Sequence, residues 1–202
     1  MRSLFLGFVL STVAVVTVHA DDATPTEVIA GAIELFAEKM DGRQEELAAD
    51  RRSLYALIDE ILLPRFDRKF AAQIVLAKHW RSADAMQRER FTEAFYQALV
   101  RRYADGLLEF DQDIVKVLPF RGDLSKPRAK VRTTVQLTDG SKVAVDYELV
   151  KRESGWLLFN VVIEGISYVR NFRAEMDSEI RRSSLGAVIE RLEGEAGISH
   201  DG

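Results

Sequence analysis

The hydrophobic pattern of this chain changes period once, near residue 113, and that change limits the folds open to it. Before this point, apolar residues recur at three- and four-residue spacing, which is typical of amphipathic helices. After it, apolar and polar residues alternate, and Val, Thr and aromatic side chains are frequent, as in half-buried strands. Helices followed by strands predict an α+β domain, in which a twisted antiparallel sheet is covered on one face by helices.

The helical part is predicted to contain several segments separated by Gly, Pro and capping residues. The first begins at Pro25, and the second spans residues 50–63 with a one-sided apolar face. A short helix is expected over 66–76, and the longest over 85–109. Beyond the strands, one more helix is expected over 166–192.

About four strands are expected, over residues 113–120, 128–137, 142–151 and 156–163. Asp139-Gly140 separates the second strand from the third, and this dipeptide is a strong signal for a tight hairpin turn. Consecutive hairpins predict an antiparallel meander. In the third strand, one set of alternating residues is apolar and the other mostly polar, so we expect one face of the sheet to be buried.

The first 20 residues are predicted to be a secretory signal peptide. Arg2 precedes an apolar run over 4–18, which is shorter than a membrane span, and 18–20 (VHA) has the small-x-small form that signal peptidase accepts. We expect cleavage after Ala20 and a single domain over 21–202, whose residues 193–202 form a disordered tail. An uncleaved anchor is the alternative. No Cys follows the cleavage point, so lipoprotein attachment is not expected, and the periplasm is the expected compartment.

Composition excludes several function classes. The chain has 202 residues and a net charge of −4, so a general nucleic-acid-binding role is not expected. It contains no Cys, which removes thiol nucleophiles, disulfides and iron–sulfur clusters. It contains three His, of which His19 lies in the leader, so neither a metal site nor a cofactor is expected.

No catalytic constellation is recognisable in the sequence. It lacks a nucleophile elbow, a phosphate-binding Gly-rich loop and a paired-His metal motif. We expect His79 to be a surface or packing residue, and His200 lies in the tail. Asp146 and Tyr147 resemble the acid and tyrosine of some isomerases, but adjacent strand residues face opposite sides unless a bulge intervenes. Asp67 is expected to cap a helix. The prediction is that the protein is not an enzyme and has no catalytic residues.

An aromatic stripe runs along the longest predicted helix. Phe91, Phe95, Leu99 and Tyr103 recur every four residues and therefore share one face of that helix. This spacing fits either a tightly packed core or the wall of an apolar cavity. Periodicity does not separate the two, because both place large hydrophobic side chains at the same positions.

Several motifs together resemble those of one family. They are residues 63–67 (LPRFD), then Trp80-Arg81, then Gln87-Arg88 followed by the aromatic stripe, and finally the run over 156–173. In this order and spacing, behind a signal peptide, they resemble the MlaC family, also called toluene-tolerance auxiliary proteins. The resemblance extends over about 25–192.

The resemblance implies a periplasmic phospholipid carrier that helps to maintain outer-membrane lipid asymmetry. It implies a fold similar to nuclear-transport-factor-two-like domains with extra helices, no catalysis, and an apolar cavity between sheet and helices for acyl chains. The implied partners are an outer-membrane lipoprotein–porin complex and an inner-membrane lipid ABC transporter. The cavity walls expected on this basis are Phe91, Phe95, Leu99, Tyr103, Val145, Tyr147, Phe159, Val161, Ile166 and Phe172.

Polar residues are expected at the mouth of that cavity. Arg101, Arg102 and Arg173 are candidates to lie near the lipid phosphate, and Tyr168 and Asn171 to donate hydrogen bonds. The alternatives are surface solvation and docking patches for anionic partners. Asn160 stands where the family often has Asp.

Three other functions remain open at the level of sequence. The first is a carrier of another apolar ligand, such as a hydrocarbon or a quinone. The second is a small isomerase or hydrolase on the same fold, which needs a titratable residue inside the cavity. The third is an adaptor with a filled core and no ligand.

Overall fold

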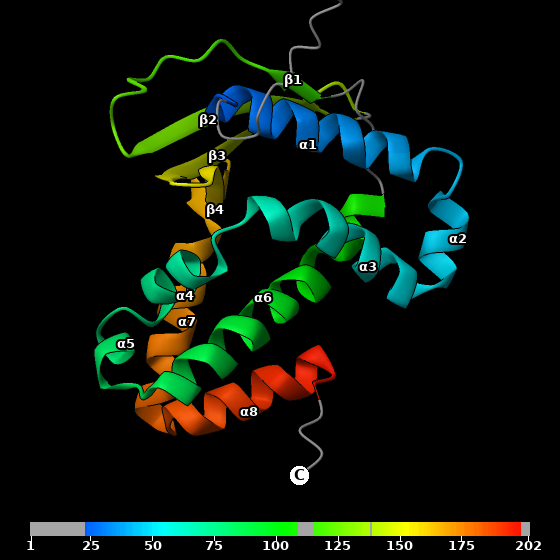
Figure 1. Ribbon diagram of the computed structural model, residues 1–202. Coiled ribbons are helices and arrows are strands. Elements are labelled where there is room, and N and C mark those ends of the chain that lie inside the picture. The colour runs from blue at the N-terminus through cyan, green and yellow to red at the C-terminus, as the bar shows by residue number, and fades with distance from the viewer. Residues whose placement is uncertain (1–22, 109–114, 138, 199–202) are drawn as a thin grey trace, which may run out of the picture.

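The computed structural model describes residues 23–108, 115–137 and 139–198 (Figure 1). Helices precede the sheet and two more follow it. Before the sheet come α1 (Pro25–Met40), α2 (Gln44–Ala49), α3 (Arg51–Leu62), the 3-10 turn η2 (Leu63–Arg65), α4 (Arg68–Leu76), α5 (Lys78–Ser82) and α6 (Ala85–Leu108). None of the described helices is long and apolar enough to cross a membrane.

The sheet is an open antiparallel meander, which confirms the predicted α+β fold. Its strands are β1 (Val115–Val117), β2 (Arg128–Gln136), β3 (Lys142–Arg152), β4 (Gly155–Ile163) and β5 (Ile166–Ser167). They are adjacent in chain order, and all neighbours are antiparallel. The fifth strand escaped prediction because a two-residue strand has no periodicity of its own.

The long helix predicted after the sheet is two helices, α7 (Tyr168–Arg182) and α8 (Leu185–Ala196). The break falls at Ser183, whose backbone is not helical, and Ser184 caps α8 by accepting a hydrogen bond from the backbone N–H of Ala187. Helix α8 ends four residues later than expected. Glu193, placed in the tail by the sequence pattern, is instead buried and pairs with Arg90 at 2.7–2.8 Å.

The start of α4 is fastened to β4. Phe66 forms a parallel bridge with Leu158, and the Asp67 N–H donates to the Leu158 carbonyl at 2.8 Å. The Asp67 carboxylate accepts from the Phe70 N–H, which confirms the predicted cap, and also pairs with Arg152 at 2.7 Å. These contacts hold α4 beside the last long strand.

One β-bulge interrupts the pairing of β3 with β4. Glu148 pairs with Asn160, whereas the next residue, Leu149, pairs with Leu158, so Phe159 is the extra residue of β4. The expected alternation of side chains is broken at this point. Phe159 and Asn160, although adjacent, consequently line the same pocket.

The two faces of the sheet have different neighbours. Helix α1 packs against β2 and β4 and covers the face that carries the buried Val131, Val145 and Leu149. The opposite face carries the exposed Arg128 and Lys130 and is bordered near β4 by α4 and α7. Helices therefore border both faces of the sheet, whereas helices on one face only were expected. Beneath the sheet, α6 packs against α3, α4 and α8 (Figure 1).

Candidate functional site

Three of the ten expected cavity residues form one fully buried aromatic cluster. Phe91, Phe95 and Phe172 are at most 1% exposed. The Phe91 and Phe95 rings stack at 5.8 Å, and Phe172 meets Phe95 edge-on at 5.2 Å. Aromatic pairs at such distances are mutually stabilising. For these residues the packed-core interpretation describes the structure, because their rings join α6 to α7 by contacting each other.

Three other expected residues form what we call the apolar sheet patch, defined as Val145, Tyr147 and Val161. Tyr147 and Val161 are register partners on β3 and β4, and Val145 lies two residues from Tyr147 on the same face. Val145 is buried, whereas Tyr147 and Val161 are half-buried. Burial raises the pKa of Tyr147, because removing the phenol from water disfavours its charged form.

A tyrosine pair connects the end of α6 to the start of α7. The rings of Tyr103 and Tyr168 meet edge-on at 4.6 Å, and Tyr103 is 37% exposed. Leu99, one turn earlier on α6, is half-buried. Leu99, Tyr103 and Tyr168 therefore lie at the boundary between core and solvent. The two Phe residues earlier in the stripe are instead fully buried.

The remaining expected residues near this pair are exposed. Ile166 is 57% exposed, and Asn171 and Arg173 project from the first turns of α7. An isoleucine at this exposure contributes little to stability, since most of its surface stays in water.

Two of the three arginines expected at the cavity mouth, Arg101 and Arg102, are engaged by neighbours. The Arg101 guanidinium lies 4.9 Å from the centre of the Tyr55 ring. Arg102 pairs with Glu175 at 3.1 Å and lies 4.5 Å from the centre of the Phe172 ring. Binding a lipid phosphate would require either guanidinium to share or leave these contacts.

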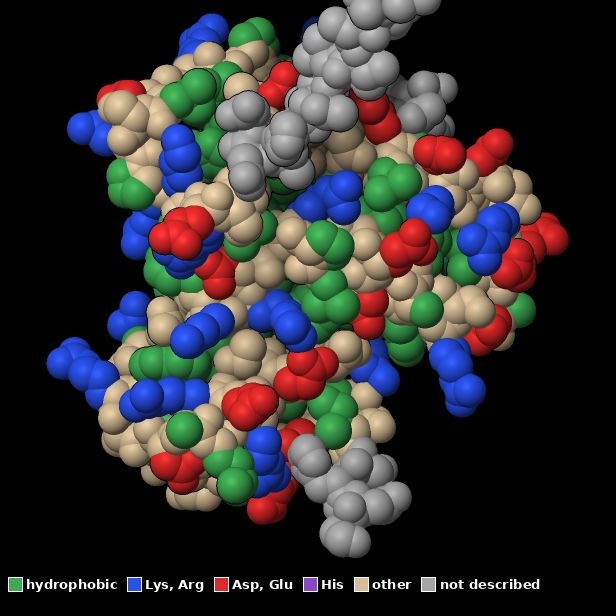
Figure 2. Space-filling view, in the orientation of Figure 1, with side chains coloured by type: hydrophobic (Ala, Val, Ile, Leu, Met, Phe, Trp, Pro, Cys, Tyr) green, Lys and Arg blue, Asp and Glu red, His purple; other side chains and the backbone are tan. Residues whose placement is uncertain are grey.

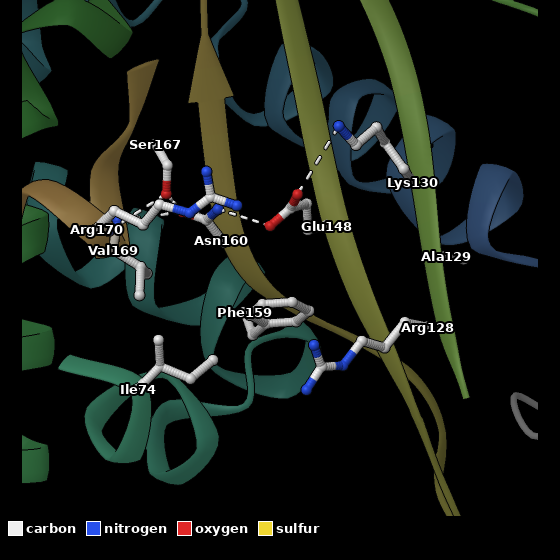
Figure 3. A pocket seen from close by; sticks show the side chains of 10 residues that line it. All are labelled: Ile74, Arg128, Ala129, Lys130, Glu148, Phe159, Asn160, Ser167, Val169 and Arg170. Carbon is white, nitrogen blue, oxygen red and sulfur yellow. Dashed lines mark hydrogen bonds and ion pairs between the residues drawn. The ribbon is translucent and has the colours of Figure 1, made fainter. Parts of the chain in front are cut away.

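A pocket of about 430 Å³ opens on the other face of the sheet, between β2–β4 and the helices α4 and α7 (Figure 3). In the view of Figure 3, α1 lies behind the strands. Of the ten expected wall residues, only Phe159 lines this pocket. Its lining consists of Ile74, Arg128, Ala129, Lys130, Glu148, Phe159, Asn160, Ser167, Val169 and Arg170.

A buried asparagine organises the inner end of the pocket. Asn160 is 3% exposed, and its side-chain amide donates to Glu148 at 2.8 Å. Its carbonyl oxygen accepts from the Ser167 hydroxyl at 3.2 Å and from the Val169 N–H at 3.1 Å. Ser167 also caps α7 by accepting from the Arg170 N–H. The network therefore fixes where α7 begins relative to β4.

Sequence reasoning missed this pocket, and two signals pointed toward it. Arg128 and Lys130 are two residues apart on one strand and must share a face. The strand predicted over 156–163 is apolar on both faces. Such a strand can contain a bulge, at which one extra residue changes the face to which the following side chains point. Neither signal indicates that α4 and α7 form the side walls of the pocket.

His79, Asp146 and Tyr147 do not form a shared site. His79 Nε2 lies 2.8 Å from the Asp177 carboxylate, and Lys78 lies 2.9 Å from it. These partners lower the pKa of Asp177 to about 2. Asp146 pairs with a lysine at the pocket face, while Tyr147 belongs to the apolar sheet patch on the other face. Within the described ranges, no three metal-ligating side chains come together.

The fold is shared with a solved structure. A phospholipid-binding protein from Ralstonia solanacearum, solved in complex with a phospholipid, superposes with a TM-score of 0.77 at 23% identity. The match covers 87% of this chain and 98% of that one. The described architecture is therefore that of a known α+β protein.

Sequence comparison identifies the family. The model of the MlaC protein family matches residues 32–194, and this chain belongs to that family. Toluene tolerance protein Ttg2D of Pseudomonas putida is 28% identical, with 95% of this chain and 87% of that protein covered. The intermembrane phospholipid transport system binding protein MlaC of Haemophilus influenzae is 19% identical, with 93% and 89% covered.

Proposed function

We propose that this protein is a periplasmic phospholipid carrier. In this role it moves lipid between an outer-membrane lipoprotein–porin complex and an inner-membrane lipid ABC transporter, and so helps to maintain outer-membrane lipid asymmetry. The observation that carries the proposal is the family match over residues 32–194. It is supported by a relative named for intermembrane phospholipid transport and by a fold match to a protein solved with a phospholipid.

Free energy explains why such a carrier needs an apolar site and no catalytic residues. A two-chain phospholipid has on the order of 30 methylenes, and exposing them to water costs roughly 24 kcal/mol at ~0.8 kcal/mol each. A protein site that replaces acyl neighbours with Val, Leu and aromatic side chains removes most of that cost. Transfer from bilayer to protein then exchanges one apolar surroundings for another, so both loading and unloading are feasible.

We place the acyl chains against the apolar sheet patch, with Leu99 and the tyrosine pair at its border. Tyr147 and Val161 are only half-buried, so a chain laid across them removes further apolar surface from water.

The head group is placed near the start of α7. Asn171 and Arg173 are exposed and adjoin the tyrosine pair in sequence. Arg101 and Arg102 contribute less in this arrangement, because each already contacts an aromatic ring. A phosphate gains more from a guanidinium that has no competing partner.

The test is to express the full chain in a Gram-negative host, collect the periplasmic fraction and extract the purified protein with organic solvent. Mass spectrometry is expected to show phospholipid at near-stoichiometric amounts, and N-terminal sequencing to begin at Asp21. Recovery of a hydrocarbon or a quinone in place of phospholipid would support the other apolar-ligand carrier. Recovery of no ligand, with the protein folded, would contradict a carrier role.

A further inference from the structure

The pocket between β2–β4, α4 and α7 lies on the opposite face of the sheet from the apolar sheet patch. Its lining residues Arg128 and Lys130 lie on β2 at positions that alternate with the buried Val131, so they face away from α1. The apolar sheet patch lies on the α1 side. The sheet itself therefore stands between the pocket and the apolar sheet patch, whereas the first turn of α7 borders the pocket through Val169 and Arg170.

The pocket carries an excess of positive charge. Three cations line it, Arg128, Lys130 and Arg170, against one carboxylate, Glu148. Glu148 is held by Asn160 at 2.8 Å and by Lys130 at 3.8 Å, and Lys130 also pairs with Asp146 outside the lining at 3.2 Å.

The two arginines are the groups left to bind a ligand. Within the described ranges, neither Arg128 nor Arg170 has a carboxylate at ion-pair distance. Arg128 rests on the Phe70 and Phe159 rings at 5.4 and 5.9 Å, which fixes its direction without neutralising it. Figure 3 shows the Arg170 side chain extending from α7 toward Asn160.

The floor of the pocket is apolar. Ile74 on α4, Phe159 on β4 and Val169 on α7 line it together. Phe159 is fixed in place by an edge-on contact with Phe70 at 5.0 Å. An inorganic anion would leave this floor uncovered, whereas a ligand with both a charged and an apolar part would contact all of the lining.

Positive side chains predominate on one flank of the molecule. Figure 2 shows Lys and Arg side chains, with some Asp and Glu side chains among them, along the flank where the sheet, α4 and α7 lie, on a chain whose net charge is −4. Such a local excess attracts anions and favours their approach over that of neutral molecules.

We propose that this pocket is a second binding site, specific for a small anionic amphiphile, that is, a carboxylate or phosphate attached to a short apolar chain. Arg128 and Arg170 bind the anion, and Ile74, Phe159 and Val169 contact the chain. A pocket of about 430 Å³ is near the lower end of ligand-site volumes, which suits one short chain and not a complete phospholipid.

The experiment is an NMR titration of the full mature chain with three probes: sodium octanoate, octyl glucoside and inorganic phosphate. Octanoate is expected to shift the backbone amide signals of Asn160, Val169 and Arg170 saturably. Octyl glucoside, with the same chain and no charge, is expected to bind at least about tenfold more weakly, since it lacks charge-assisted hydrogen bonds. Phosphate should shift the same signals at higher concentration.

Variants separate this site from a general charge effect. Arg128→Gln and Arg170→Gln are each expected to weaken octanoate binding about tenfold. Arg132→Gln, on the same strand and face as Arg128 but outside the pocket, should change it less than about twofold.

Three results would overturn the proposal: equal binding of octyl glucoside, equal loss in all three variants, or no saturable binding of octanoate. A fourth result is loss of co-purified phospholipid in Arg128→Gln and Arg170→Gln. It would show that the pocket belongs to the lipid site, and the existence of a second site would then be contradicted while the carrier function stood.

Discussion

The two faces of the sheet are built from the same strands and present different chemistry. On the α1 side, β3 and β4 contribute Val145, Tyr147 and Val161, whose side chains are apolar or nearly so. On the other side, β2 and β3 contribute arginine, lysine and glutamate, with a buried asparagine from β4. Alternation of side chains along a strand makes this division possible, because neighbouring residues point to opposite faces.

One thin layer thus presents two chemically different surfaces. A face of Val and Tyr binds by removing apolar area from water, which is non-directional. A face with fixed guanidinium groups binds by charge-assisted hydrogen bonds, which are directional. The two faces are not fully distinct at the bulge, because the bulge adds the aromatic ring of Phe159 to the charged face.

The largest expected effect is a loss of stability at the buried cluster of Phe91, Phe95 and Phe172. Phe95→Ala should lower the free energy of unfolding by about 3–5 kcal/mol, since it empties a fully buried ring position. Val161→Ala on the half-buried sheet patch should cost only about 1 kcal/mol. Urea unfolding followed by circular dichroism measures both, and equal losses would mean that the patch is as tightly packed as the core.

The next largest effect is expected from substitutions that fill the apolar sheet patch or its border with a larger side chain. Val161→Trp and Leu99→Trp should each reduce co-purified phospholipid about tenfold while the protein remains folded, because the indole occupies the space of an acyl chain. Mass spectrometry of extracts measures the lipid. The matched control is Ala144→Trp, at an exposed position of β3 on the opposite face, and a similar loss there would argue against the assignment of the face.

A third prediction concerns the polar network that fixes α7 to β4. Asn160→Ala removes the acceptor of the Ser167 hydroxyl and the Val169 N–H, and it leaves Glu148 with Lys130 as its remaining partner, at a cost of about 1–3 kcal/mol. Amide hydrogen exchange of Val169 should accelerate in the variant. Unchanged exchange would show that α7 does not depend on this asparagine.

The smallest expected effect is a pH dependence of stability at Asp177, which lies on neither face of the sheet. The pKa of Asp177 is lowered to about 2 by Lys78 and His79, so its contribution to stability is complete above its ordinary value of 3.8 and is lost as pH falls toward 2. Asp177→Asn should therefore destabilise the protein slightly at pH 7 and not at pH 2. Thermal unfolding at both values checks this, and a larger loss at the lower pH would reverse the sign.

Much of the sheet could be predicted because its signals are local. The turn at Asp139-Gly140 is present, with Gly140 at φ +83° and Ser141 N–H bonded to the Asp139 carboxylate. The three long strands begin and end within one residue of their predicted limits. Predicted residues of the first strand, 113–114, lie outside the described ranges, as do the leader, its cleavage site and His200.

The site was harder to predict because it depends on what packs against each face. Phe91 and Tyr103 belong to one helical stripe, yet one is fully enclosed and the other is 37% exposed. Phe91 stacks on Phe95 inside the core, whereas Tyr103 meets Tyr168 at the start of α7 and keeps part of its surface in solvent. The bulge likewise depends on how β4 pairs with β3, and a single strand's sequence does not specify its register.

The lipid-carrier proposal is tested most directly by determining which face of the sheet touches the acyl chains. Isotope-filtered NOE spectra of the lipid-loaded protein, with labelled Val and Ile methyl groups, report this contact. NOEs are expected from acyl methylene protons to Val145 and Val161, on the α1 side. NOEs to Ile74 and Val169 instead, across the sheet, would contradict it.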